Sequence, residues 1–105
     1  MTDERFKVGW PNLAGWLAYW VAGTLFVKEA AYDEVQRYFD FNSSSECYCD
    51  ARFLELETLG PRTILAPGER VSHRERWRLF PDVELTADPE AVAKTLTDLK
   101  IISRQ

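Results

Sequence analysis

The sequence predicts a mainly β fold, an antiparallel β-sandwich that ends in a single C-terminal α-helix. Apolar and polar residues alternate through two segments, 52–59 and 71–80, as they do in half-buried strands. Near the end of the chain, the spacing of apolar residues changes to that of an amphipathic helix. This order is typical of one sheet-based domain, and 105 residues are enough to build its hydrophobic core.

Three strands are expected in the first third of the chain. Residues 5–10 alternate weakly, and Pro11 ends them. Residues 13–21 are apolar on both faces, which indicates a central strand covered on both sides, or a strand with one face left for a ligand or partner. Ala22-Gly23 is a tight-turn signal, so residues 24–29 should pair with the preceding strand as a hairpin.

The middle of the chain gives weaker signals. Residues 30–38 fit a helical spacing as well as a loop, and we favour a loop followed by a strand over 36–41, because strands flank this segment. Residues 42–45, with three serines in a row, form a plain loop. A short strand over 46–50 and a tight link at Asp50-Ala51 follow.

The segments 52–59 and 71–80 are expected to be two long strands joined by a turn-rich connector. Pro67-Gly68 is a turn signal, because proline presets φ and glycine accepts a positive φ. If the apolar faces of both strands point to one core, the two glutamates of the first strand lie opposite the arginines of the second as a salt ladder. The residues of this ladder are Glu55, Glu57, Arg74, Arg76 and Arg78.

The C-terminal helix is expected from about Asp88 to Ile101. Asp88 can cap the helix, and Pro89 suits its first turn. Apolar residues then recur with the period of one helical face at Val92, Leu96 and Leu99.

Composition excludes several classes of protein. The net charge of −4 argues against a general nucleic-acid binder, and no apolar run approaches the roughly 20 residues that span a bilayer. The charged N-terminus lacks the apolar core of a signal peptide, so a cytoplasmic location is expected. Cys47 and Cys49 are expected to be reduced thiols, because their spacing suits neither a structural disulfide nor a zinc site. No metal or cofactor is expected.

Four segments together resemble the C-terminal part of galactose-mutarotase-like proteins, in particular uncharacterised bacterial relatives of the aldose epimerases. They are G-W-L-A-Y-W, L-F-V-K, E-C-Y-C-D-A-R-F-L-E-L-E-T-L-G-P and L-A-P-G-E-R-V-S-H-R-E-R-W-R-L, and the resemblance covers residues 8–80. It implies a large antiparallel β-sandwich with a concave sugar site, in which a histidine acid and a glutamate base interconvert anomers. Family members are typically more than twice as long as this chain. A sheet edge and an aromatic face that the full fold would cover are therefore expected to be open. We expect a homodimer that covers them, and the alternative is a monomer whose terminal helix lays Val92, Leu96 and Leu99 over the same face.

The residues that could carry sugar chemistry are Glu55, Glu57 and His73 as catalytic groups, and Trp16, Trp20, Arg52, Glu75 and Trp77 as ligand-binding groups. Strand alternation places His73 and Glu75 on the face opposite to Glu55 and Glu57, so these four residues do not complete one acid–base site. For each candidate a structural role is the simpler alternative: the salt ladder, a histidine hydrogen-bonded to Glu75, tryptophans in the core, and a solvated arginine.

Three functions therefore remain open. The leading one is a non-catalytic, carbohydrate-binding, mutarotase-like domain. The second is an aldose 1-epimerase-type isomerase whose site is completed across a dimer. The third is a structural or protein-interaction module whose tryptophan face binds protein. Neither a nucleic acid nor a membrane is an expected partner.

Overall fold

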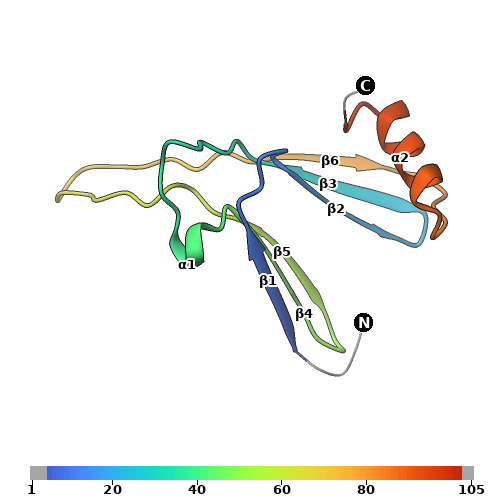
Figure 1. Cartoon of the computed structure of the whole chain (residues 1–105), viewed down its shortest axis with the longest axis horizontal. Helices are drawn as coiled ribbons and strands as arrows, with labels where there is room; N and C mark the ends of the chain where they lie inside the picture. Colours follow the sequence, from blue (N-terminus) through green and yellow to red (C-terminus); the bar gives the residue numbers. More distant parts are fainter. Residues whose placement is uncertain (1–4, 103–105) are drawn as a thin grey trace. The chain divides into compact units, whose positions relative to one another are not determined.

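The computed structural model describes residues 5–102 and is mainly β, which confirms the predicted fold class. Its strands form two antiparallel three-stranded sheets, in the orders β1-β4-β5 and β2-β3-β6, and a short helix follows the last strand (Figure 1). This element content is consistent with a small β-sandwich-like fold. The described chain divides into two compact units, residues 5–17 with 28–76 and residues 18–27 with 77–102.

The strands are β1 (Phe6–Trp10), β2 (Trp16–Val21), β3 (Thr24–Glu29), β4 (Ser45–Cys49), β5 (Leu54–Thr58) and β6 (Arg76–Phe80). The helical segments are α1 (Phe39–Asn42) and α2 (Pro89–Asp98). Within residues 5–102, no helix has the length and apolar character needed to cross a membrane.

The sheet β1-β4-β5 of the first unit has one apolar and one polar face. Its register pairs Val8 with Cys47 and Cys47 with Leu56, so these three side chains share the apolar face. On the polar face Glu46 lies between Gly9 and Glu57. Both cysteines are free and half-buried.

The expected strand over residues 36–41 is wrong. Asp40, Phe41 and Asn42 all have positive φ, so the one-turn segment α1 is left-handed and cannot join a sheet. Two polar contacts hold this backbone: the Asn42 side chain accepts a hydrogen bond from the Tyr38 amide at 2.9 Å, and the Ser43 hydroxyl donates to the Asp40 carbonyl at 2.6 Å. Side-chain bonds of this kind offer the backbone an alternative to a strand ladder.

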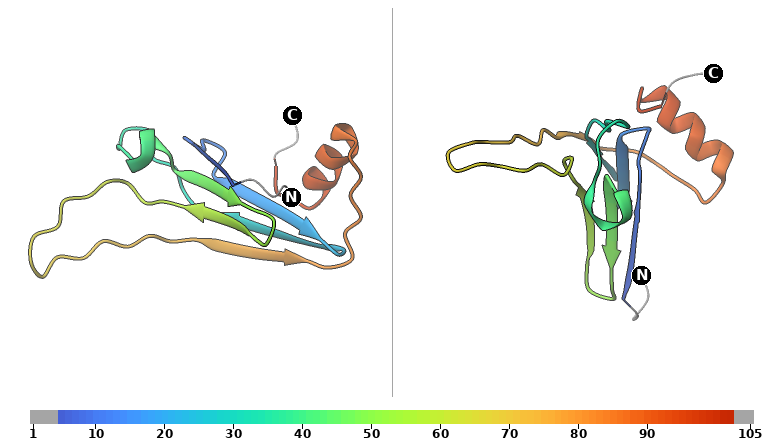
Figure 2. Two further views of the ribbon diagram at one scale, coloured as in Figure 1. Left: turned by 90° about the horizontal axis from the view of Figure 1, so that it is seen from below. Right: turned by 60° about the vertical axis from the view of Figure 1, so that its left-hand side comes forward.

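The connector between β5 and β6 is longer than expected. It runs out and back as two extended legs over residues 59–75, and the Pro67-Gly68 turn lies between them (Figure 2). Gly68 has a φ of 87°, and the Glu69 amide donates to the Ala66 carbonyl at 3.0 Å, which confirms this turn.

The predicted pairing of the strands over 52–59 and 71–80, and with it the salt ladder, is wrong. β5 pairs with β4, whereas β6 pairs with β3 in the other sheet. Glu55 lies opposite Tyr48, and Glu57 lies opposite Glu46. Alternation predicts which residues share a face, but it does not determine which strand becomes the neighbour.

The second unit is built on the β2-β3 hairpin. Ala22 and Gly23 both have positive φ, as a two-residue hairpin turn requires, so this predicted turn is confirmed. β3 is the central strand and supplies the buried residues Leu25 and Val27. β2 is an edge strand, so the alternative of a central strand is wrong, whereas a face left for a ligand or partner stays a prediction.

Helix α2 begins where the sequence predicted. The Asp88 side chain accepts the Glu90 amide at 3.3 Å, and Pro89 is the first helical residue. The helix ends at Asp98, earlier than Ile101, and Lys100 has a φ of 61°. No residue of α2 is buried, whereas its apolar stripe is half-buried.

Candidate functional site

An open hollow of about 510 Å³ lies in the first unit, and we call it the arginine hollow. Three segments that are far apart in the sequence line it: the loop between β1 and β2, the end of β3 with the loop that follows, and the residues at the start of β6. Its lining consists of Leu13, Ala14, Gly15, Glu29, Ala30, Ala31, Tyr32, Arg74 and Arg76.

A buried asparagine holds the first wall of the arginine hollow. Asn12 donates its side-chain amide to the Trp16 carbonyl and the Ser45 hydroxyl, both at 2.9 Å, and its own backbone N–H bonds to Ser44. Gly15 then has a φ of 77° and accepts the Ala30 amide at 2.9 Å. A side chain at Gly15 would come within 2.9 Å of the Ala30 carbonyl oxygen, so glycine allows the two walls to meet here.

The second wall carries an aromatic ring with a fixed orientation. Tyr32 stacks on Tyr38, with ring centroids 5.3 Å apart and an interplanar angle of 28°. Tyr38 is only 5% exposed, and its hydroxyl accepts the Asp33 amide at 3.0 Å. The buried ring of Tyr38 therefore restricts the Tyr32 ring. As a result, Tyr32 loses little further side-chain entropy when a ligand contacts it.

The third wall supplies charge. Arg74 and Arg76 are two residues apart on extended backbone, and both are exposed where they line the arginine hollow. Glu29 provides one carboxylate against these two guanidinium groups, so the lining has one positive charge in excess. Guanidinium groups donate hydrogen bonds and a carboxylate accepts them. Together they can therefore bond to a hydroxyl group both as acceptor and as donor.

The catalytic candidate His73 lies elsewhere in this unit. Its Nε2 atom is 2.7 Å from the Thr58 hydroxyl oxygen, and the same hydroxyl donates to the Glu75 carboxylate. Lys28 lies 3.6 Å from Glu75 and donates to the Leu56 carbonyl at 2.8 Å. The sequence predicted that His73 and Glu75 share a face, and the structure joins them through Thr58, which sequence reasoning missed.

The glutamates of β5 lie away from this histidine. Glu57 faces Glu46, which is 5% exposed, and Glu55 is exposed. Burial raises the pKa of Glu46, as do its hydrogen bond to Asp40, the Asp40 charge and the Glu57 charge, whereas Lys7 at 3.9 Å lowers it. Glu55 and Glu57 therefore belong to a carboxylate-rich face without a histidine.

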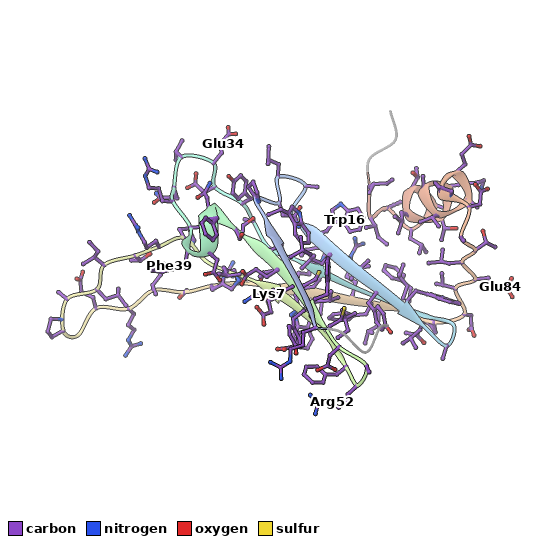
Figure 3. All side chains as sticks on the ribbon, turned by 60° about the horizontal axis from the view of Figure 1, so that its bottom comes forward. Lys7, Trp16, Glu34, Phe39, Arg52 and Glu84 are labelled. Atoms are coloured by element: carbon purple, nitrogen blue, oxygen red, sulfur yellow. The ribbon has the colours of Figure 1, made fainter. Side chains whose placement is uncertain are left out.

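The ligand-binding candidate Arg52 stabilises a turn. It lies between β4 and β5 (Figure 3), where its guanidinium is 3.1 Å from the Asp50 carboxylate. Asp50 also accepts the amides of Arg52 and Phe53, and these bonds lower its pKa to about 2. The bond to Asp50 raises the pKa of Arg52. This network closes the β4-β5 hairpin.

The tryptophan candidates lie on different faces. Trp77 contacts Phe26 edge-to-face at 5.6 Å and is 63% exposed, whereas the Trp20 ring N–H donates to the Val83 carbonyl at 2.7 Å. The two-residue turn pairs Tyr19 with Phe26, so Tyr19 and not Trp20 shares the face of Trp77. Trp16 is half-buried at the start of β2.

The residues of the arginine hollow were not singled out by sequence reasoning as a group. Arg74 and Arg76 were assigned to the salt ladder, and Glu29 and Tyr32 carried no motif. The nearest signal was Gly15, which interrupts an apolar run where a close backbone approach occurs.

Comparison with known proteins yields no relative. No family model, no curated protein and no solved structure matches the chain. Across residues 5–102, no three His, Cys, Asp or Glu side chains come together as metal ligands would.

Proposed function

We propose that the protein is a non-catalytic carbohydrate-binding domain whose ligand, a monosaccharide or the end of an oligosaccharide, occupies the arginine hollow. The observation that carries this proposal is the lining itself: a tyrosine ring beside two guanidinium groups and one carboxylate. A pyranose presents a C–H face that suits an aromatic plane and hydroxyls that both donate and accept hydrogen bonds.

The size of the arginine hollow supports the same conclusion. Its volume of about 510 Å³ falls within the range of small-molecule sites, roughly 300–1,000 Å³. An adjoining hollow of about 490 Å³ shares Leu13 and Tyr32 with it, which leaves room for a second sugar unit. The resemblance of residues 8–80 to mutarotase-like proteins points to the same ligand class.

The geometry at His73 favours binding over catalysis. A general acid and a general base must lie on either side of the reacting atoms. His73 and Glu75 instead contact the same Thr58 hydroxyl, so no substrate fits between them. Glu57, the other candidate base, lies on the opposite face of β5 from Thr58, because neighbouring residues of a strand alternate.

Titration of the whole chain with a panel of monosaccharides and oligosaccharides tests the proposal, by calorimetry and by amide chemical shifts. We expect shifts around Gly15, Tyr32 and Arg76, and a dissociation constant raised about 10-fold in Arg76→Gln, because a hydrogen bond to a charged group contributes roughly 1.5–3 kcal/mol. Arg70→Gln is the matched control, since Arg70 is exposed and lies outside this lining.

Two results would overturn the proposal. One is the absence of heat and shift changes across the panel. The other is mutarotation of an aldose, followed by optical rotation, at a rate well above that of buffer. Activity of that kind, abolished by His73→Asn or Glu57→Gln, would establish the epimerase instead.

A further inference from the structure

The edge strand β2 differs from the other three strands that lie at sheet edges. Its sequence, W-L-A-Y-W-V, contains no charge, proline or glycine. β6 carries Arg76 and Arg78, β5 carries Glu55 and Glu57, and β1 carries Lys7 and Gly9. Natural proteins protect unpaired edges with such residues, because an open row of N–H and C=O groups pairs readily with another strand. β2 is the edge that lacks this protection.

The hairpin turn determines which backbone groups of β2 point outward. Two-residue turns are closed by a pair of residues that exchange hydrogen bonds, here Val21 and Thr24. Because the direction alternates along a strand, the amides of Val21 and Tyr19 point toward β3. Those of Trp16, Ala18 and Trp20 point away from it, toward the open edge of the sheet.

The charges on the edge strands indicate which strand can pair with β2. Antiparallel pairing of β2 with its own copy places no like charges opposite each other, because the strand has none. The same self-pairing would set arginine against arginine at β6 and glutamate against glutamate at β5. Of these edges, β2 is therefore the one suited to a two-fold symmetric contact.

We propose that β2 pairs antiparallel with β2 of a second copy of this chain, so that two three-stranded sheets become one continuous sheet. Centred on Ala18, the pairing satisfies the outward amides of Trp16, Ala18 and Trp20. It then sets Tyr19, which is 39% exposed, opposite Leu17 of the copy, and the Tyr19 of the copy becomes its diagonal neighbour.

Light scattering on the full chain at micromolar concentration is the first test. We expect a mass of twice 12.2 kDa, and a mass of 12.2 kDa would overturn the proposal. Two variants then locate the contact. Tyr19→Lys places a charge on the edge, and Ala18→Pro removes an outward N–H at a position where an edge strand tolerates proline. Both variants should be monomeric with an unchanged circular dichroism spectrum.

Leu79→Lys is the matched control, because Leu79 is 68% exposed on β6, at the opposite edge of the same sheet. This variant should stay dimeric. A monomeric Leu79→Lys, or a Tyr19→Lys variant that folds and remains dimeric, would exclude the β2 contact.

If neither β2 variant folds, hydrogen exchange on the wild type tests the β2 pairing instead. The amides of Trp16, Ala18 and Trp20 should exchange slowly and become faster on dilution. Fast exchange at every concentration would contradict the pairing. A partner other than a second copy would appear as a wild-type chain of monomer mass whose β2 amides are protected only in the presence of that partner, which would also overturn the proposal.

Discussion

The Nε2 atom of His73 lies 2.7 Å from the hydroxyl oxygen of Thr58. The single proton of that hydroxyl is donated to the Glu75 carboxylate, so the hydroxyl oxygen must accept from His73. A neutral His73 ring in this arrangement is the Nε2–H tautomer. The Thr58 hydroxyl thus contacts the side chains of both His73 and Glu75.

Thr58→Val should remove both bonds at once. We expect the free energy of unfolding to fall by about 1 kcal/mol, and the His73 ring to lose its preference for the Nε2–H tautomer. Nitrogen chemical shifts of the imidazole report the tautomer, and urea denaturation reports stability. Thr63→Val is the control, because the Thr63 hydroxyl bonds only to a nearby carbonyl on the exposed legs. Unchanged imidazole shifts in Thr58→Val would contradict this arrangement.

Gly9→Ala should destabilise the first unit. A Cβ atom at this position would lie 2.6 Å from the Ser43 hydroxyl oxygen and 3.2 Å from Cγ of Glu46, its pairing partner in β4. Overpacking of this kind costs about 1–3 kcal/mol. Ser43→Ala removes the closest atom but also the Ser43 bond to the Asp40 carbonyl, so it serves as the reference. In urea denaturation, Gly9→Ala should cost less in the Ser43→Ala background than in the wild type. An equal cost in both backgrounds would show that the Ser43 contact is not the cause.

Glu46 should make the protein less stable as the pH rises above about 4.5. Its folded-state pKa is raised above 4.5, so its contribution to stability is fully present below about pH 4.5 and is lost as the pH rises through the folded-state value. Glu46→Gln keeps a neutral side chain at every pH. We expect the wild type to lose stability relative to this variant as the pH rises above about 4.5, measured by urea denaturation. A constant difference would exclude a raised pKa.

Asp50 should make stability depend on pH in the opposite direction to Glu46, and at lower pH. Its pKa is lowered from 3.8 to about 2, so its contribution is present above pH 3.8 and is lost as the pH falls through about 2. Asp50→Asn should therefore be less stable than the wild type at neutral pH, and the difference should shrink in strong acid. A difference that persists at the lowest pH would point to packing rather than to the carboxylate charge.

Trp20→Phe should remove a hydrogen bond that attaches the segment after β6 to β2. The Trp20 ring N–H holds the Val83 carbonyl at 2.7 Å, and the Val83 amide in turn donates to Gly23 at 2.8 Å. We expect a loss of about 1 kcal/mol and faster exchange of the Val83 amide. Trp77→Phe keeps an aromatic ring beside Phe26 on an exposed face, so it should change stability by less than about 0.5 kcal/mol. Equal losses in both variants would contradict the role of the Trp20 bond.

Several features of this protein follow from the sequence alone, because each depends on residues that are close along the chain. The turns at Ala22-Gly23 and Pro67-Gly68 require a backbone conformation that their own residues supply. The start of α2 depends on Asp88 and Pro89 together. Alternation also placed His73 and Glu75 on one face, and their shared contact with Thr58 agrees with it.

Only the tertiary structure decided which strands become neighbours and which residues line the arginine hollow. β5 and β6 have complementary charges, yet each pairs with another strand, because burial of apolar faces outweighs exposed ion pairs of at most about 1 kcal/mol. Arg74 and Tyr32 meet in one hollow although 41 intervening residues separate them. A local pattern reports the face of a strand, whereas a site built from distant segments depends on how the whole chain packs.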